Sequence, residues 1–289
     1  MEIAHITRSD AARVQGKVRH GVISGELLVG DTASDGLDFR MAISWTGKGD
    51  DAFTTARHRH SFQQVRWAVT GAANFAPDQD IPEGDVGYFP RGAYYGPQRQ
   101  DGEEVMLLQF GFGNEHIGGR DSQRRGEEAL AKIAARGGKL EGDVIVDVDP
   151  ETGKIRRRDV VTALYEEMTG GAYTIDPSGY GAPVVMHPRS FEYFDVAGGA
   201  RMKRLGCFFD HPGLNADLRL SIVRLRENSS FALGADRAQV AWSRQAGLVV
   251  NGGAAQPELA AVYSPRGETV TLASNGDIEI HLVEFPRLD

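Results

Sequence analysis

The stretch ARHRHSFQQVRWAVTG, residues 56–71, contains the side chains of this chain that are best suited to metal binding or catalysis. His58 and His60 stand one residue apart, and Gln64 and Arg66 follow closely. Residues i and i+2 of a β-strand face the same side, so the two imidazoles could offer two nitrogen ligands to one transition metal. Arg66 shares a strand face with Gln64, where its guanidinium could bind a substrate carboxylate or enolate. The alternative for Arg66 is a surface or salt-bridged arginine.

A second stretch, GDVGYFPRGAYYGPQR at residues 84–99, adds aromatic side chains. Tyr95 could bind a metal through its phenol oxygen or donate a hydrogen bond to a substrate. A phenol with a pKa of about 10 ionises only beside a strong Lewis acid, so both roles stay open. Together with Phe89 and Tyr95, Tyr88 and Tyr94 are expected to form an aromatic rim, and Tyr88 and Tyr94 are expected to line the substrate pocket. The alternative for this cluster is core packing.

The two stretches resemble the two sequence motifs of the cupin family. His58, His60 and Gln64 fall at the spacing of the first motif, G-x5-H-x-H-x3-4-E-x6-G, with glutamine where the family has glutamate. Gly84, Pro90 and Gly92 fit the second motif, which has histidine where this chain has Tyr95. The resemblance implies a divalent transition metal, with iron as first choice and nickel, manganese, zinc or copper as alternatives. It implies these metal ligands: His58, His60, Gln64 and Tyr95.

Gln64 itself can be interpreted in two ways. An amide oxygen is a neutral and weaker metal donor than the carboxylate of the family motif. Gln64 is therefore either a metal ligand or a residue that supports the ligands by hydrogen bonds.

The surrounding sequence predicts many short strands, because apolar runs alternate with glycine, proline, asparagine and aspartate. The runs are GELLVG, DFRMAISW, VRWAVTG, DVGYFP and EVMLLQFGF, then DLRLSIVRL, AGLVV, LAAVYSP and IEIHLVEF. Between them, residues 122–138 and 158–171 have apolar residues three and four apart and end on glycine, which predicts two helices. The residues between these helices read as a hairpin around Pro-Glu-Thr-Gly.

The β-rich halves also look like copies of each other. A shift of 175 residues sets YFPRG on YSPRG and VMLLQFG on IHLVEFP, and a shift of 179 sets DFRMAI on DLRLSI. A shift of 181 sets WAVTG on LVVNG, and it places His58 and His60 on Gln239 and Ala241. We therefore expect an all-β chain with a helical linker, built from duplicated cupin-type jelly-roll barrels, or bicupin. The second barrel should bind no metal.

Three domains follow from this pattern. Residues 1–118 form an N-terminal cupin domain with the metal site, residues 119–183 a helical linker with a hairpin, and residues 184–289 a degenerate C-terminal cupin domain.

Composition limits the partners. A formal charge of −8, spread over mixed acidic and basic residues, argues against nucleic acid, and no apolar run is long enough to span a membrane. Cys207 is the single cysteine, so no internal disulfide can form, and a cytoplasmic location is expected. The family resemblance adds an expected homodimer.

The function expected from these residues is a metal-dependent enzyme that acts on a small organic molecule, with Tyr95 and Arg66 as catalytic candidates. The first interpretation is a dioxygenase-type oxidoreductase. A redox-neutral lyase, decarboxylase or isomerase is the alternative within enzymes. A non-catalytic cupin that binds or senses a small molecule is the alternative outside them.

Overall fold

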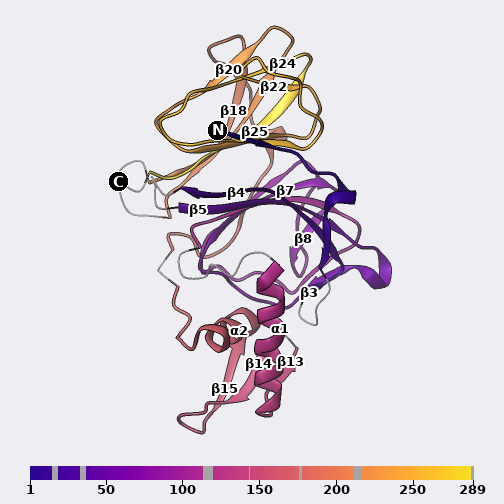
Figure 1. The fold of residues 1–289 in the computed structure, drawn as a ribbon, viewed down its shortest axis with the longest axis vertical. Coiled ribbons are helices and arrows are strands. Elements are labelled where there is room, and N and C mark those ends of the chain that lie inside the picture. Colours follow the sequence, from indigo (N-terminus) through magenta and orange to yellow (C-terminus); the bar gives the residue numbers. More distant parts are fainter. Residues whose placement is uncertain are drawn as a thin grey trace.

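The computed structural model describes residues 1–14, 19–32, 37–112, 120–142, 144–175, 178–210 and 216–287. Two β-barrels and one smaller mixed unit follow one another along the long axis of the molecule (Figure 1). The prediction of an all-β chain, with two helices that come between the two barrels in the sequence, is confirmed. The domain boundary predicted at residue 118 lies outside the described residues.

The N-terminal barrel is built on a seven-stranded antiparallel sheet. Its strand order is β16 (Val184–Met186), β10 (Val86–Phe89), β7 (Gln63–Thr70), β12 (Glu104–Phe110), β5 (Leu37–Thr46), β4 (Val22–Thr32) and β2 (Ala12–Val14). Smaller sheets complete it, made of β11 (Gln98–Gln100), β6 (Phe53–Thr55) and β3 (Arg19–His20), and of β8 (Ala73–Ala76) with β9 (Gln79–Ile81). Every strand predicted in this half is present.

The C-terminal barrel repeats this plan. Its seven-stranded sheet has the order β1 (Glu2–Ala4), β23 (Ala260–Ser264), β21 (Gln239–Ser243), β25 (Ile278–Glu284), β19 (Leu218–Leu225), β18 (Arg201–Phe208) and β17 (Phe194–Asp195). A three-stranded sheet closes it, made of β20 (Ser230–Leu233), β24 (Val270–Ser274) and β22 (Leu248–Val250).

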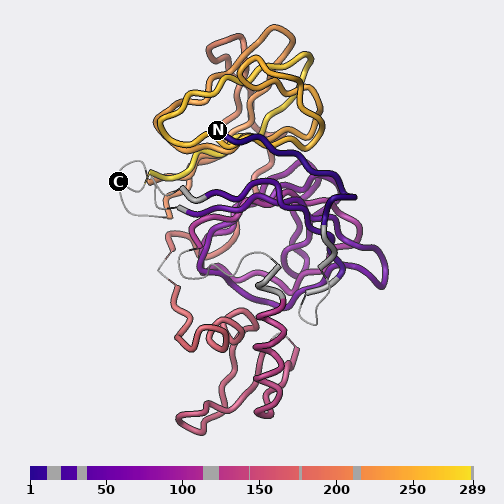
Figure 2. Tube along the Cα trace, viewed as in Figure 1, coloured from indigo at the N-terminus to yellow at the C-terminus, as the bar shows by residue number. Residues whose placement is uncertain are grey.

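The two barrels exchange their edge strands. β1, from the start of the chain, pairs with β23 of the C-terminal barrel, and β16, which precedes that barrel, pairs with β10 of the N-terminal barrel. Figure 2 shows the indigo N-terminal segment running along the yellow barrel. Both exchanged strands cover an edge that would otherwise carry unpaired backbone groups.

A single apolar core joins the large sheets of the two barrels. It contains Val65 and Trp67 from β7 together with Val240 and Trp242 from β21. Because side chains alternate along a strand, Gln64 and Arg66 point away from this core, into the N-terminal barrel. The strand that packs the barrels together therefore also presents the candidate site.

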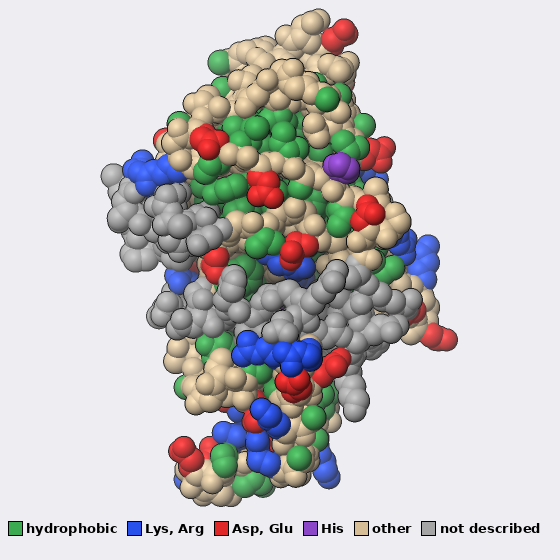
Figure 3. Space-filling view, viewed as in Figure 1, with side chains coloured by type: hydrophobic (Ala, Val, Ile, Leu, Met, Phe, Trp, Pro, Cys, Tyr) green, Lys and Arg blue, Asp and Glu red, His purple; other side chains and the backbone are tan. Residues whose placement is uncertain are grey.

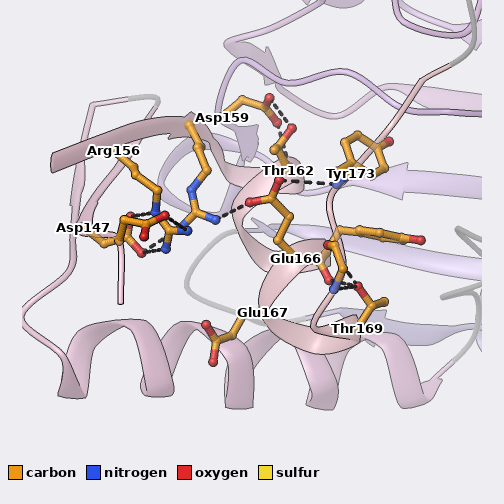
Figure 4. A network of polar contacts seen from close by, with 12 residues as sticks. Asp147, Arg156, Asp159, Thr162, Glu166, Glu167, Thr169 and Tyr173 are labelled. Carbon is orange, nitrogen blue, oxygen red and sulfur yellow. Dashed lines mark hydrogen bonds and ion pairs between the residues drawn. The ribbon is translucent and has the colours of Figure 1, made fainter. Parts of the chain in front are cut away.

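The smaller unit contains both predicted helices, α1 (Arg120–Ala135) and α2 (Val160–Thr169). The predicted hairpin is β14 (Val144–Val148) with β15 (Ile155–Asp159), and β13 (Lys139–Glu141) adds a third strand. α2 begins where the carboxylate of Asp159 accepts a hydrogen bond from the Thr162 amide, and it ends at Gly170 in a left-handed conformation. Figure 4 shows the ion pairs that connect β14, β15 and α2.

Among the described residues, no helix is long and apolar enough to cross a membrane. On the face drawn in Figure 3, hydrophobic side chains gather over the C-terminal barrel, while many charged side chains lie over the smaller unit.

Candidate active site

His58 and His60 lie in the segment between β6 and β7, not on a regular strand as expected. The backbone of His58 pairs with Tyr95, by two hydrogen bonds of 2.9 and 3.0 Å. The carbonyl of His60 instead accepts from the amide of Gly92, which has a φ of 76°. The turn after β10 therefore holds this segment, and a continuous ladder cannot form.

The two imidazoles nevertheless lie next to each other and next to Tyr95. The ring centroids are 4.9 Å apart for His58 and His60 and 4.5 Å apart for His58 and Tyr95. Nδ1 of His58 lies 2.6 Å from the carbonyl oxygen of Ala56, which can only accept a hydrogen bond. Nδ1 therefore carries the proton, and Nε2 is the basic nitrogen. The ring of His60 stacks on Phe62 at 4.3 Å, which fixes its orientation.

Gln64 holds both Tyr95 and Arg66. Its carbonyl oxygen accepts from Nη2 and Nε of Arg66, at 3.1 and 3.3 Å, and from the Gln109 amide at 3.5 Å. Its NH2 group donates to the Tyr95 hydroxyl at 2.6 Å. A guanidinium can only donate, so the amide orientation follows from the contact with Arg66. The oxygen that would face a metal is already used by a cation.

Arg66 points into the barrel, and its side chain is 6% exposed. Its guanidinium carbon lies 4.2 Å from the ring centre of Phe89 and 4.5 Å from that of Tyr95. Burial lowers the pKa of Arg66, while the phenol of Tyr95 acts in the opposite direction. Arg66 forms no ion pair with any described residue. The interior of the barrel thus contains a buried guanidinium beside the phenol of Tyr95, and this phenol ring in turn lies against the imidazole of His58.

Tyr88 does not line this site, so the expectation for that residue was wrong. It faces Val65 across the ladder, which places its side chain in the core between the barrels. There its hydroxyl donates to Gln63 at 2.9 Å, and its ring stacks on Phe208 of the C-terminal barrel at 4.1 Å. Burial is the main cause that raises the pKa of Tyr88.

Tyr94 lies at the surface beside the histidine segment and is 37% exposed. The guanidinium carbons of Arg57 and Arg59 lie 4.0 and 5.0 Å from its ring centre. Tyr94 is therefore outside the enclosed site.

Strand register gives the true correspondence between the two barrels. Gln64 lies opposite Phe89 and Gln109, and Gln239 lies opposite Ser264 and Glu284. Each pair of counterparts differs by 175 residues, so the shift of 181 proposed for this strand was wrong. The apolar run LVV misled the comparison, because it forms β22 in a different sheet.

The same register identifies the counterparts of the site residues. The bridge between His58 and Tyr95 corresponds to the pair Leu233 and Val270, and the hydrogen bond from Gly92 to His60 corresponds to one from Gly267 to Ala235. Arg66 faces Gly87 and Leu107, as Ala241 faces Val262 and Leu282. The C-terminal barrel thus has these apolar residues where the N-terminal barrel has its polar site: Leu233, Ala235, Ala241 and Val270.

Sequence reasoning missed Gln109. Gln109 is a polar residue within the apolar run VMLLQF, and this break in the pattern was the available signal. It accepts a hydrogen bond from Arg40 at 3.4 Å and contacts Gln64. Phe89, which was expected in the aromatic rim, does reach the site, because its ring lies against the guanidinium of Arg66.

No protein-family model and no curated protein matches the sequence. Solved structures do match its fold. One match is HEPD from Streptomyces albus, with 2-hydroxyethylphosphonate and Fe(II) bound. The match spans 99% of this chain and 76% of the HEPD chain, at 9% sequence identity and a TM-score of 0.58. A variant of oxalate decarboxylase from Bacillus subtilis covers 98% and 77% at 13% identity and a TM-score of 0.54. Protein Ylba from E. coli covers 96% and 89% at 8% identity and a TM-score of 0.53.

These likenesses establish the class of structure. The chain has the cupin fold, in the all-β jelly-roll form that the sequence predicted. At this low identity, the likeness extends to the fold alone.

Proposed function

We propose that the chain is a bicupin enzyme that acts on a small organic molecule in its N-terminal barrel, with a divalent metal as cofactor. The observation that carries this proposal is the contrast between the barrels at equivalent positions. The C-terminal barrel folds without polar side chains at these positions, where it has the apolar residues Leu233, Ala235, Ala241 and Val270. Burying polar groups costs free energy, which supports a functional reason for those in the N-terminal barrel.

The donor set that fits a metal is His58, His60 and Tyr95. Two imidazole nitrogens and a phenol oxygen suit iron, copper and neighbouring transition metals. The hydrogen bond from Nδ1 of His58 to Ala56 is the kind of support that orients a metal-bound imidazole. Gln64 fits poorly as a ligand, because a metal at its carbonyl oxygen would lie beside the Arg66 guanidinium.

Each of the chain's own residues has a distinct part in this proposal. Gln64 fixes the hydroxyl of Tyr95, and Arg66 offers hydrogen-bond donors that can orient a substrate. Phe62 holds the ring of His60, and Phe89 limits the access of water to the guanidinium. When bound, the metal would supply Lewis acidity and, if it is iron, activation of dioxygen.

We place a dioxygenase-type oxidation first, because a site with two imidazoles and little negative charge leaves metal positions open. The structural neighbours include both an iron-bound HEPD and a decarboxylase, so the fold also supports redox-neutral chemistry as the second candidate.

A binding protein without metal is the candidate from another class. The observation in its favour is that the described residues contain no group of three or more His, Cys, Asp or Glu side chains able to hold a metal. The carbonyl oxygen of Gln64 is also already occupied by Arg66.

Metal analysis distinguishes these classes. We expect protein loaded separately with Fe(II), Mn(II), Ni(II), Zn(II) or Cu(II) to retain about one ion per chain for at least one metal. His58→Ala and His60→Ala should each lower the affinity at least tenfold, because each removes one of the two nitrogen donors. His281→Met, which removes a histidine in the other barrel, is the matched control and should bind like wild type. The enzyme proposal would be rejected if no metal bound to the wild-type protein. It would also be rejected if the variant that combines His58→Ala with His60→Ala still bound one metal ion per chain.

A further inference from the structure

Arg66 is a buried cation whose described partners are all neutral. They are the amide oxygen of Gln64, the phenol of Tyr95 and the rings of Phe89 and Tyr95. No carboxylate among the described residues forms an ion pair with it. A buried charge usually needs an opposite charge, because the cost of leaving water exceeds what neutral acceptors return.

Two other arginines with little solvent exposure do have a carboxylate partner. Arg237 is 1% exposed and lies 2.7 Å from Asp217. Arg158 in the smaller unit lies 2.7 Å from Asp147. Arg66 differs from these two arginines, and it lies inside the proposed site.

The approach to the site adds positive charge. Arg57 and Arg59 lie around the ring of Tyr94, next to the two histidines, and neither forms an ion pair with a described residue. Nε of Arg59 is buried and has no hydrogen-bond partner among the described residues. In a chain with a net charge of −8, this local excess of arginine favours an anionic ligand.

We infer that the substrate of the proposed enzyme carries a carboxylate that pairs with Arg66. This inference rests on the proposed function in one respect, because it takes the bound carboxylate to be the substrate of the enzyme. The binding of the carboxylate to Arg66 does not itself require the metal. A guanidinium matches a planar carboxylate through two parallel hydrogen bonds. The rings of Phe89 and Tyr95 lie against the guanidinium, so the remainder of the substrate is expected to be apolar or aromatic.

The test compares acids with their amides on chelator-treated protein. Acetate and benzoate are titrated against acetamide and benzamide, with calorimetry and melting temperature as readouts. We expect each carboxylate to bind at least tenfold more tightly than its amide and to raise the melting temperature. Arg66→Ala should abolish the preference, and it should fold, because Ala241 occupies the equivalent position of the other barrel.

Gln64→Glu is the second variant, because it places a carboxylate beside Arg66. This internal counter-ion should raise the melting temperature of the ligand-free protein and weaken benzoate binding at least tenfold. Equal binding of acids and amides would overturn the inference. So would carboxylate binding that appears only with metal and survives Arg66→Ala, although the proposed enzyme would then still stand. Carboxylate binding that depends on Arg66 in a protein unable to hold metal would support the inference and reject the metal enzyme.

Discussion

The carbonyl oxygen of Gln64 lies 3.1 Å from Nη2 of Arg66, and this contact changes the part that Gln64 can play. Motif spacing predicted correctly that His58, His60, Gln64 and Tyr95 meet, because the spacing reflects which backbone segments lie side by side. Spacing could not show that Gln64 serves Arg66, since that depends on the direction of one amide. Nor could it show that Tyr88 faces the other barrel, because that orientation follows from its register opposite Val65.

Tyr95→Phe tests the phenol oxygen alone. The phenyl ring can keep its contacts with His58 and Arg66, while the hydroxyl that receives the Gln64 hydrogen bond is lost. We expect metal affinity to fall at least tenfold and the free energy of unfolding to fall by about 1–2 kcal/mol, because the NH2 group of Gln64 loses its acceptor. Metal titration and urea unfolding measure the two effects. Unchanged metal affinity with reduced turnover would make Tyr95 a substrate-binding residue.

The smaller unit shows what helical periodicity can and cannot predict. The apolar spacing predicted α1 and α2, and the Pro-Glu-Thr-Gly turn predicted the hairpin, but β13 was not predicted. Its sequence, KLE, has no strong strand signal. The charged side chains that hold the unit together were also not foreseen. Asp147 is buried and pairs with Arg156 at 2.8 Å and Arg158 at 2.7 Å, and Arg158 also contacts Glu166 of α2 (Figure 4).

Asp147→Asn tests this network at the scale of the element. Burial raises the pKa of the Asp147 carboxyl, but the hydrogen bond from Arg156 and the charges of Arg158 and Arg156 bring it below its usual range. The stabilisation is therefore present above about pH 4 and is lost as the pH falls through the lowered pKa. Asp147→Asn should lower the free energy of unfolding by about 3 kcal/mol, because it leaves two arginines without their shared carboxylate. Hydrogen exchange should show faster opening of residues 144–169 at pH 7. Glu141→Gln, which breaks an exposed pair with Arg157, is the control and should change little.

At the scale of the whole molecule, the two barrels meet through equivalent faces that differ at a few positions. Trp67 and Trp242 are counterparts, and their ring centroids lie 5.6 Å apart across the interface. Met106 faces Trp67 as His281 faces Trp242. The repeat was visible in the sequence, but the correct shift for β7 was not, because an apolar pentapeptide fits several strands equally well. Strand pairing selects among these shifts, since the shift of 175 places Gln64 and Gln239 at equivalent points of their ladders.

His281 makes the interface sensitive to acid, where its counterpart Met106 does not. Its ring stacks on Trp242 at 4.4 Å, Nδ1 is buried without a hydrogen bond to any described residue, and burial lowers the pKa of His281 to about 3. The unfolded chain takes up a proton near pH 6.5, whereas the folded chain does not. This histidine therefore reduces stability as the pH falls below about 6.5, by at most about 1.4 kcal/mol per pH unit. A cleft of about 600 Å³ beside it is also lined by charged residues that can moderate this effect: Asp85, Arg244, Glu258 and Glu279.

His281→Met introduces the methionine that the N-terminal barrel has at the equivalent position, Met106. Because methionine does not titrate, we expect the free energy of unfolding to fall less steeply between pH 6.5 and pH 4 than in wild type, while at pH 8 the two proteins differ little. Urea unfolding at several pH values measures this slope. Met106→His is the reciprocal control and should add acid sensitivity, because it puts a second imidazole into a fully buried position of the same interface. Parallel stability curves for wild type and His281→Met would show that His281 is protonated in the folded protein, and that the interface solvates its charge.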